Sequence, residues 1–114
     1  MKKAVIVVGA ANAGKSTTCR EFKKLVKMES ERKFTLNGKW GHILSSSFEE
    51  TNRDVEATVR RYSGYDYLVL VCQGAVLKDL HAALKNASFL AKDVRIKHPT
   101  EAREKAKEVL ARLK

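Results

Sequence analysis

One short segment near the start of the chain combines two glycines, a lysine and a hydroxyl side chain at a spacing that suits phosphate chemistry. It reads Gly9-Ala-Ala-Asn-Ala-Gly14-Lys15-Ser16 and follows an apolar run of mostly β-branched residues. Gly9 lets the chain turn sharply, and Gly14 lets the backbone approach a ligand without a Cβ in the way. We expect the backbone N–H groups from Asn12 to Ser16 to point inward and form an anion-binding nest.

The side chains of this segment predict a nucleotide phosphate as the ligand, with Mg²⁺ beside it. Lys15 would neutralise β- and γ-phosphate oxygens and so take part in catalysis, and the Ser16 hydroxyl would ligate Mg²⁺. A helix that begins here adds the positive end of its dipole to the same phosphates. The residues predicted to bind the nucleotide are Gly9, Asn12, Ala13, Gly14, Lys15 and Ser16.

Strands and helices are expected to alternate around this segment. Residues 3–8 and 67–72 are continuous apolar runs, which suits strands buried on both faces of a parallel sheet. Asn37-Gly38 lies between two strand-like runs and predicts a hairpin, because both central residues of a type I′ turn need positive φ. The remaining expected elements are strands at 33–36, 39–44 and 94–96 and helices at 15–28, 49–62, 77–87 and 99–113.

This alternation predicts one α/β domain over residues 1–114, with three layers. Its sheet should have about five strands, mostly parallel, with helices on both faces and the hairpin strands antiparallel.

Composition excludes several classes of protein. No apolar run in the 114 residues approaches the roughly 20 that a membrane span needs. The first residues imitate a secretion signal, but their apolar core is too short for one. Two cysteines are too few for a disulfide scaffold or a zinc site. We therefore expect a cytoplasmic protein without membrane association.

The glycine-lysine segment fits the Walker A pattern G-x-x-x-x-G-K-[ST] in full, and the chain resembles a minimal P-loop NTPase along nearly its whole length. The resemblance implies binding of ATP or GTP with Mg²⁺ at the carboxyl ends of the strands. It implies that Thr17 reaches an α-phosphate oxygen. It also implies a strand order of 2-3-1-4-5, which places strand 39–44 beside strand 3–8. The activity that follows is nucleoside-triphosphate hydrolysis, slow or dependent on an activating protein partner.

Two features of small GTPases are missing from the chain. Their third strand ends in Asp-x-x-Gly, where this sequence reads Ser45-Ser46-Ser47-Phe48. Their guanine motif, Asn-Lys-x-Asp, is also absent, so the choice between ATP and GTP stays open. Ser45 or Ser46 could contact Mg²⁺ or a bridging water in place of the aspartate. Glu49 and Glu50 could hold the metal or polarise an attacking water, or could simply begin a helix, where negative charge is favourable.

Other side chains give weaker indications of function. Asp54 is a weaker candidate for the metal. Trp40 and Phe48 are expected to pack in the core or contact a partner rather than stack on a base. The histidines form no ligand pattern. Candidates for the positive charge that activates phosphate transfer are Arg53, Arg60, Arg61 and Arg95.

Two further functions stay open. The net charge of +10 permits a nucleic-acid or protein interaction module in which the Walker A segment is ligand-gated or vestigial. Its basic residues are spread along the chain and mixed with glutamates, which is typical of a solvated surface. The third alternative is a phosphotransferase for a small substrate, although no stretch resembles a substrate-binding lid.

Overall fold

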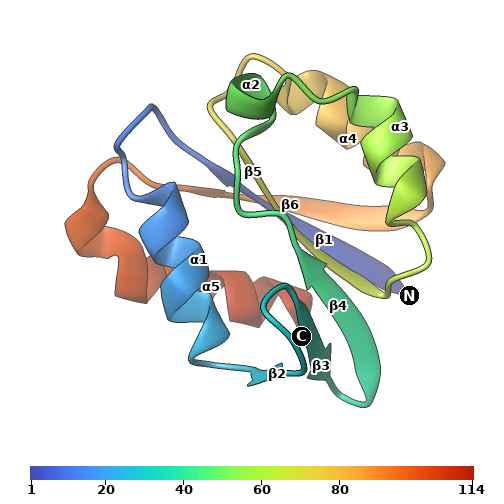
Figure 1. Cartoon of the computed structure of the whole chain (residues 1–114), viewed down its shortest axis with the longest axis horizontal. Coiled ribbons are helices and arrows are strands. Elements are labelled where there is room, and N and C mark those ends of the chain that lie inside the picture. The colour runs from blue at the N-terminus through green and yellow to red at the C-terminus, as the bar shows by residue number, and fades with distance from the viewer.

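Two apolar strands form the centre of the sheet in the computed structural model, which describes residues 1–114 (Figure 1). Strands β1 (Lys2–Val8) and β5 (Tyr67–Cys72) pair in parallel, with Val5 opposite Val69. Every residue of β5 is buried, as are the last five of β1. Side chains point to both faces of these strands, so burying them requires a helical layer on each side.

The complete sheet is mixed and has six strands in the order β2-β3-β4-β5-β1-β6. Strand β6 (Phe89–Arg95) pairs in parallel with β1, and β4 (Lys39–Ile43) pairs in parallel with β5. Strands β3 (Lys33–Leu36) and β2 (Lys27–Met28) continue the sheet in antiparallel pairings. Three of the five pairings are therefore parallel, and the predicted hairpin is the antiparallel pair β3–β4.

Helices cover both faces of the sheet, as the sequence predicts (Figure 1). On one face lie α1 (Lys15–Lys23) and α5 (Ala102–Leu113), which follows the short 3₁₀ helix η1 (Pro99–Glu101). On the other lie α2 (Phe48–Thr51), α3 (Val55–Arg61) and α4 (Leu77–Asn86). Each layer encloses its own hydrophobic core, of 16 residues under α1 and α5 and 13 under the other three helices.

The hairpin turn has the predicted conformation. Asn37 and Gly38 have φ angles of 55° and 75°, so both central residues are left-handed. The turn fixes Trp40 opposite Thr35 and Lys33 opposite His42.

The strand order implied by the family resemblance is wrong. Strand β5 lies between β4 and β1, so the strand that begins at Lys39 does not touch β1. Burial patterns could not decide this point, because β1 and β5 are apolar on both faces and either order buries them equally.

Two predicted boundaries are also wrong by several residues. Helix α1 ends at Lys23 rather than Met28, and Lys27–Met28 forms β2 instead, which lets Val26 and Met28 pack on the first core from an extended chain. Strand β6 starts at Phe89 rather than at Val94. It is an edge strand that contains polar residues, so the presence of an apolar run does not indicate most of its length.

The predicted helix 49–62 is two helices. Asn52, with φ of 50°, ends α2, and the Asp54 carboxylate begins α3 by accepting a hydrogen bond of 2.8 Å from the Ala57 N–H. Asp54 therefore caps α3, and it is not a lining residue of the cavity beside the Walker A segment.

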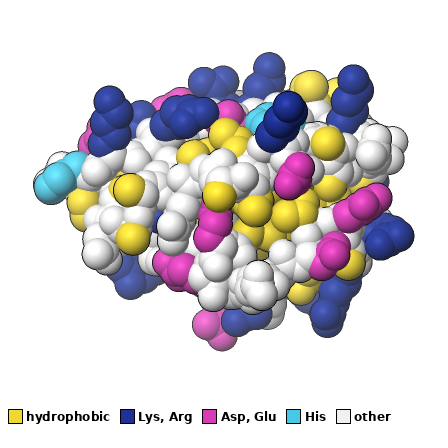
Figure 2. All heavy atoms as spheres, turned by 90° about the horizontal axis from the view of Figure 1, so that it is seen from above, with side chains coloured by type: hydrophobic (Ala, Val, Ile, Leu, Met, Phe, Trp, Pro, Cys, Tyr) yellow, Lys and Arg dark blue, Asp and Glu magenta, His cyan; other side chains and the backbone are white.

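Charged side chains are distributed over the surface rather than gathered on one helix. Figure 2 shows Lys and Arg around the rim of one face, with Asp and Glu among them. Both cysteines are buried and unpaired. None of the helices has the length and apolarity needed to cross a bilayer.

His42 is buried on β4 without a hydrogen-bond partner for its Nδ1 atom. It is 6% exposed, and its ring lies 4.4 Å from that of Tyr62 and 5.2 Å from that of Tyr65, between centroids. Burial, reinforced by nearby cations, lowers the pKa of His42 to about 4. Those cations belong to Lys33, Arg32, Arg53 and Arg61.

This buried ring predicts a pH dependence of stability. Unfolded His42 takes up a proton below pH 6.5, whereas the folded protein resists protonation down to about 4, so the free energy of unfolding falls as pH drops through this window. We expect His42→Leu to reduce the loss between pH 7 and 4.5 by about 2 kcal/mol. Urea unfolding at several pH values measures it. Equal losses in both proteins would contradict the assignment.

Candidate functional site

The Walker A segment forms the loop between β1 and α1, at the carboxyl edge of the sheet (Figure 1). Neighbouring strands hold its start: the Gly9 N–H donates to the Cys72 carbonyl at 3.2 Å, and the Ile96 N–H donates to the Val8 carbonyl at 2.9 Å. The loop is thus fixed between the ends of β5 and β6.

Both glycines of the segment are required by close contacts with the chain after β6. A Cβ on Gly9 would lie 2.5 Å from the Ile96 carbonyl oxygen, and one on Gly14 would lie 2.6 Å from the Pro99 Cα. Gly14 also has a φ of 103°, and Asn12 has a φ of 65°. Two left-handed residues so close together bend the backbone of the loop sharply.

Five backbone N–H groups of this region have no acceptor in the protein. Those of Asn12 and Gly14 make no hydrogen bond, and those of Lys15, Ser16 and Thr17 form the open first turn of α1. No side chain caps this nine-residue helix. The exposed donors and the positive end of the helix dipole therefore coincide at one place.

Lys15 is held inside this loop. Its side chain is directed back along the loop, where Nζ donates to the Ala10 carbonyl at 2.6 Å, and the residue is 6% exposed. Thr18 fixes the start of the helix, because its Oγ1 donates to the Gly14 carbonyl at 2.8 Å. Lys15 forms no salt bridge, so no carboxylate is paired with its ammonium group beside the open N–H groups.

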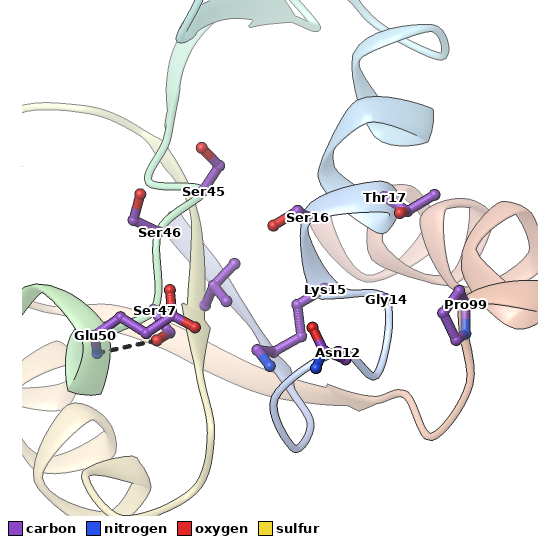
Figure 3. A pocket seen from close by; sticks show the side chains of 11 residues that line it. Asn12, Gly14, Lys15, Ser16, Thr17, Ser45, Ser46, Ser47, Glu50 and Pro99 are labelled. Atoms are coloured by element: carbon purple, nitrogen blue, oxygen red, sulfur yellow. Dashed lines mark hydrogen bonds between the residues drawn. The ribbon is translucent and has the colours of Figure 1, made fainter.

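The predicted hydroxyl residues divide between two sides of α1. Figure 3 shows Ser16 pointing across the cavity toward Ser45 and Ser46, whereas Thr17 lies on the other side of the helix. The Thr17 hydroxyl accepts a hydrogen bond of 3.1 Å from the Arg20 guanidinium. Thr17 nevertheless lines the cavity, and its hydroxyl hydrogen is not used in this bond.

A cavity of about 490 Å³ separates the Walker A segment from the chain after β4. The opposite wall carries the three serines and Glu50, whose carboxylate extends from α2 toward the cavity (Figure 3). The cavity is lined by Asn12, Gly14, Lys15, Ser16, Thr17, Ser45, Ser46, Ser47, Glu50, Val71 and Pro99. The structure thus brings Ser45, Ser46 and Glu50 to the same cavity as the Walker A segment, although β4 is not a neighbour of β1.

The oxygen atoms of this cavity suit Mg²⁺. Ser16, Ser45, Ser46 and Glu50 offer hydroxyl and carboxylate oxygens, the hard ligands that Mg²⁺ prefers. The structure has no cluster of three or more His, Cys, Asp or Glu side chains arranged to hold a metal. A Mg²⁺ ion here would take most of its remaining ligands from phosphate and water, as Mg²⁺ usually does in nucleotide-binding sites.

Glu49 has a different place from Glu50. Its carboxylate accepts hydrogen bonds from the backbone N–H groups of Gln73 at 2.8 Å, Gly74 at 3.0 Å and Val76 at 3.4 Å. Burial works to raise the pKa of Glu49, but these bonds outweigh it and hold the pKa below its ordinary value. Glu49 is not a lining residue of the cavity; it ties α2 to the loop after β5.

None of the candidate activating arginines lines the cavity. Arg95 lies 3.8 Å from the Asp93 carboxylate, and Arg53, Arg60 and Arg61 line separate hollows. Three lining residues escaped the sequence reasoning: Ser47 at the start of α2, Val71 near the end of β5, and Pro99, which was expected only to open a helix. Val71 and Pro99 lie near or after the ends of strands at the same sheet edge, which was the available signal.

The comparisons with known proteins show the fold and nothing further. No protein-family model matches the chain, and no curated protein matches it. A solution NMR structure of a de novo designed protein, described as having the PFK fold, superposes with a TM-score of 0.58. The two sequences are 14% identical, and the superposition covers 99% of this chain and 91% of the designed chain. The chain is therefore similar in architecture to a designed α/β protein.

The Glu49 contacts predict a specific loss of stability. We expect Glu49→Ala to lower the free energy of unfolding by about 2 kcal/mol, because three backbone N–H groups lose their acceptor. The matched control is Glu50→Ala, whose side chain receives one bond of 3.4 Å and should change stability by less than about 0.5 kcal/mol. Urea unfolding measures both.

The pH dependence separates the charge of Glu49 from its packing. The pKa of Glu49 in the folded protein lies below the ordinary value of 4.5. The stabilisation by the charged Glu49 carboxylate is therefore fully present above pH 4.5 and is lost as the pH falls through the folded pKa. Equal losses in the two variants at pH 7 would rule out the role of Glu49.

Proposed function

We propose that the protein binds a Mg²⁺-nucleoside triphosphate, ATP or GTP, in the cavity between the Walker A segment and Ser45–Glu50. The observation that carries the proposal is the row of five unpaired backbone N–H groups beside the buried ammonium of Lys15. Such donors at a helix N-terminus bind phosphate oxygens in many proteins. The opposite wall supports the proposal because it supplies the oxygens that a phosphate-bound Mg²⁺ needs.

The phosphates would replace contacts that the loop now makes with itself. Lys15 Nζ, which donates to the Ala10 carbonyl, would turn to the β- and γ-phosphate oxygens. Ser16 would hold Mg²⁺ from the α1 side, and Ser45 or Ser46 would approach it from the other wall, directly or through water. The N–H groups of Asn12, Gly14, Lys15, Ser16 and Thr17 would need no rearrangement, because they already lack partners, whereas that of Ala13 donates to the Ala10 carbonyl at 3.1 Å.

Hydrolysis should be slow in the isolated protein. Glu50 is the carboxylate in the cavity and the candidate for polarising an attacking water, whereas Glu49 is engaged by the backbone. Charge that develops on the transferred phosphoryl group needs a further cation, and no arginine lines the cavity. An arginine supplied by a partner protein would complete the site.

The same lining predicts weak discrimination between bases. Ten of the eleven lining residues are polar, glycine or proline, and none is aromatic, so nothing offers a stacking surface or a dedicated set of donors for one base. Binding energy should come mainly from the phosphates. We expect the dissociation constants for ATP and GTP to lie within about tenfold of each other.

Isothermal titration with Mg²⁺-ATP and Mg²⁺-GTP tests the proposal. Lys15→Ala should weaken binding of both nucleotides by about 30-fold or more, the effect of a charge-assisted phosphate contact. Lys24→Ala removes the same charge just beyond the other end of α1, where Lys24 pairs with Glu21 at 2.7 Å, and should leave the affinity unchanged.

Two results would contradict the proposal. Equal binding by wild type and Lys15→Ala would place the nucleotide elsewhere, and no binding by the folded wild-type protein would remove the site. Fast turnover by the purified protein would instead contradict the need for a partner while leaving the binding site intact.

A further inference from the structure

The hairpin β3–β4 presents one face that the helices leave partly open. Lys33 lies opposite His42 and Thr35 opposite Trp40, so these four side chains share a face of the hairpin. The other face carries Phe34 and belongs to the core under α1 and α5. On the open face Lys33 is exposed and Trp40 is 48% exposed. We name this surface, with Tyr62, Gly64 and Tyr65 beside it, the hairpin face.

Aromatic rings continue along the hairpin face from the strand to the end of α3. Trp40, Lys33, Gly64 and Tyr65 line a hollow of about 420 Å³. The Tyr65 ring lies 6.3 Å from that of Tyr62, between centroids, and the His42 ring contacts both. Tyr62 in turn lines a second hollow of about 400 Å³. The aromatic rings therefore join the two hollows.

The second hollow is lined by three arginine side chains that form no salt bridge. It is lined by Arg32, Arg53, Asp54, Thr58, Arg61 and Tyr62. Its single acid, Asp54, lies at the start of α3, where its carboxylate caps the helix. None of the three arginines forms a salt bridge, and neither does Lys33. Helix α5 differs, because four of its basic side chains are paired with glutamates: Arg103, Lys105, Lys107 and Arg112.

The depressed pKa of His42 is in keeping with this arrangement. Burial lowers this pKa most, and the positive charges of four residues of the hairpin face and its second hollow lower it further: Lys33, Arg32, Arg53 and Arg61. Four cations that form no salt bridge thus act on one buried ring. A polyanion bound beside the arginines would reduce the electrostatic repulsion among them, and this reduction would favour binding. Surface cations that are already paired with carboxylates do not provide this contribution.

We propose that the hairpin face binds single-stranded nucleic acid. Arg32, Arg53 and Arg61 would contact successive phosphates, and bases would stack on the exposed Trp40 ring and on Tyr65. Aromatic side chains beside a positive groove bind single strands in this way, because every base has a face that can stack. A duplex hides those faces and an acidic peptide lacks them, so the exposed tryptophan favours a single strand over both.

This site is separate from the proposed nucleotide site. The two hollows and the cavity of the Walker A segment share no lining residue. Loss of nucleotide binding on mutation of Lys15 therefore leaves the second site testable, and either proposal can fail without the other.

The test uses fluorescein-labelled oligo(dT) and oligo(U) of 12 residues, measured by anisotropy between 0.05 and 0.3 M NaCl, with the full-length protein. Arg53→Gln/Arg61→Gln should weaken binding about 25-fold at 0.1 M salt, which is the loss of two single-strand phosphate contacts. The magnitude of the salt slope should fall by about 1.4. The matched control Arg103→Gln/Arg112→Gln removes equal charge from α5 on the opposite side of the sheet and should change affinity less than threefold.

Stacking has its own direct readout, because Trp40 is the only tryptophan of the chain. Unlabelled oligo(dT) should quench the fluorescence of the wild-type protein, and a duplex of equal length should quench it less. Trp40→Ala should weaken binding of the labelled single strand about fivefold or more. Thermal unfolding of each variant confirms that it is folded before binding is compared.

Four results would overturn the proposal. Equal losses in the two arginine pairs would show diffuse attraction to the net charge. Tighter binding of the duplex without tryptophan quenching would show a non-specific polyanion contact, and equal binding of polyglutamate would indicate a protein partner. No measurable binding of the single strand at 0.05 M salt would remove the site.

Discussion

The structure depends on how closely the loop after β1 passes the chain that leaves β6. Neither Gly9 nor Gly14 has room for a Cβ, because the Ile96 carbonyl and the Pro99 backbone occupy that space. This contact lies just before the start of α1, where five residues that line the cavity have unpaired backbone N–H groups: Asn12, Gly14, Lys15, Ser16 and Thr17. The parallel strands β5, β1 and β6 hold the contact in place, and α1 and α5 pack side by side beneath it.

The opposite wall of the cavity is built independently, from the chain after β4. Because β5 separates β4 from β1, the serines reach the cavity across a strand rather than from a neighbouring one. The Glu49 carboxylate stabilises this wall by accepting hydrogen bonds from three backbone N–H groups of the loop after β5. The neighbouring Glu50 lines the cavity instead. The adjacent residues Glu49 and Glu50 of α2 therefore differ in role: Glu49 is structural, and Glu50 is the one proposed to take part in the chemistry.

Much of this was predictable where short-range rules apply. The Walker A segment, the Asn37-Gly38 turn and the buried strands β1 and β5 each carry a local signal, and each is found where the sequence places it. The strand order was not predictable, since two strands buried on both faces can exchange places without changing their burial. Nor could the sequence separate Glu49 from Glu50, because their difference arises from contacts made 24 to 27 residues away. The open face of the hairpin was missed for the same reason: Trp40 meets Tyr65 only through the fold.

The central claim is that the five unpaired N–H groups between Asn12 and Thr17, all but that of Ala13, bind phosphate. The most direct measurement is a two-dimensional ¹H–¹⁵N NMR titration of the wild-type protein with Mg²⁺ and a non-hydrolysable nucleoside triphosphate. The amide resonances of Asn12, Gly14, Lys15, Ser16 and Thr17 should shift most, saturate together, and return when the nucleotide is removed. Saturable shifts centred on any other part of the chain, or none at millimolar nucleotide, would contradict the account.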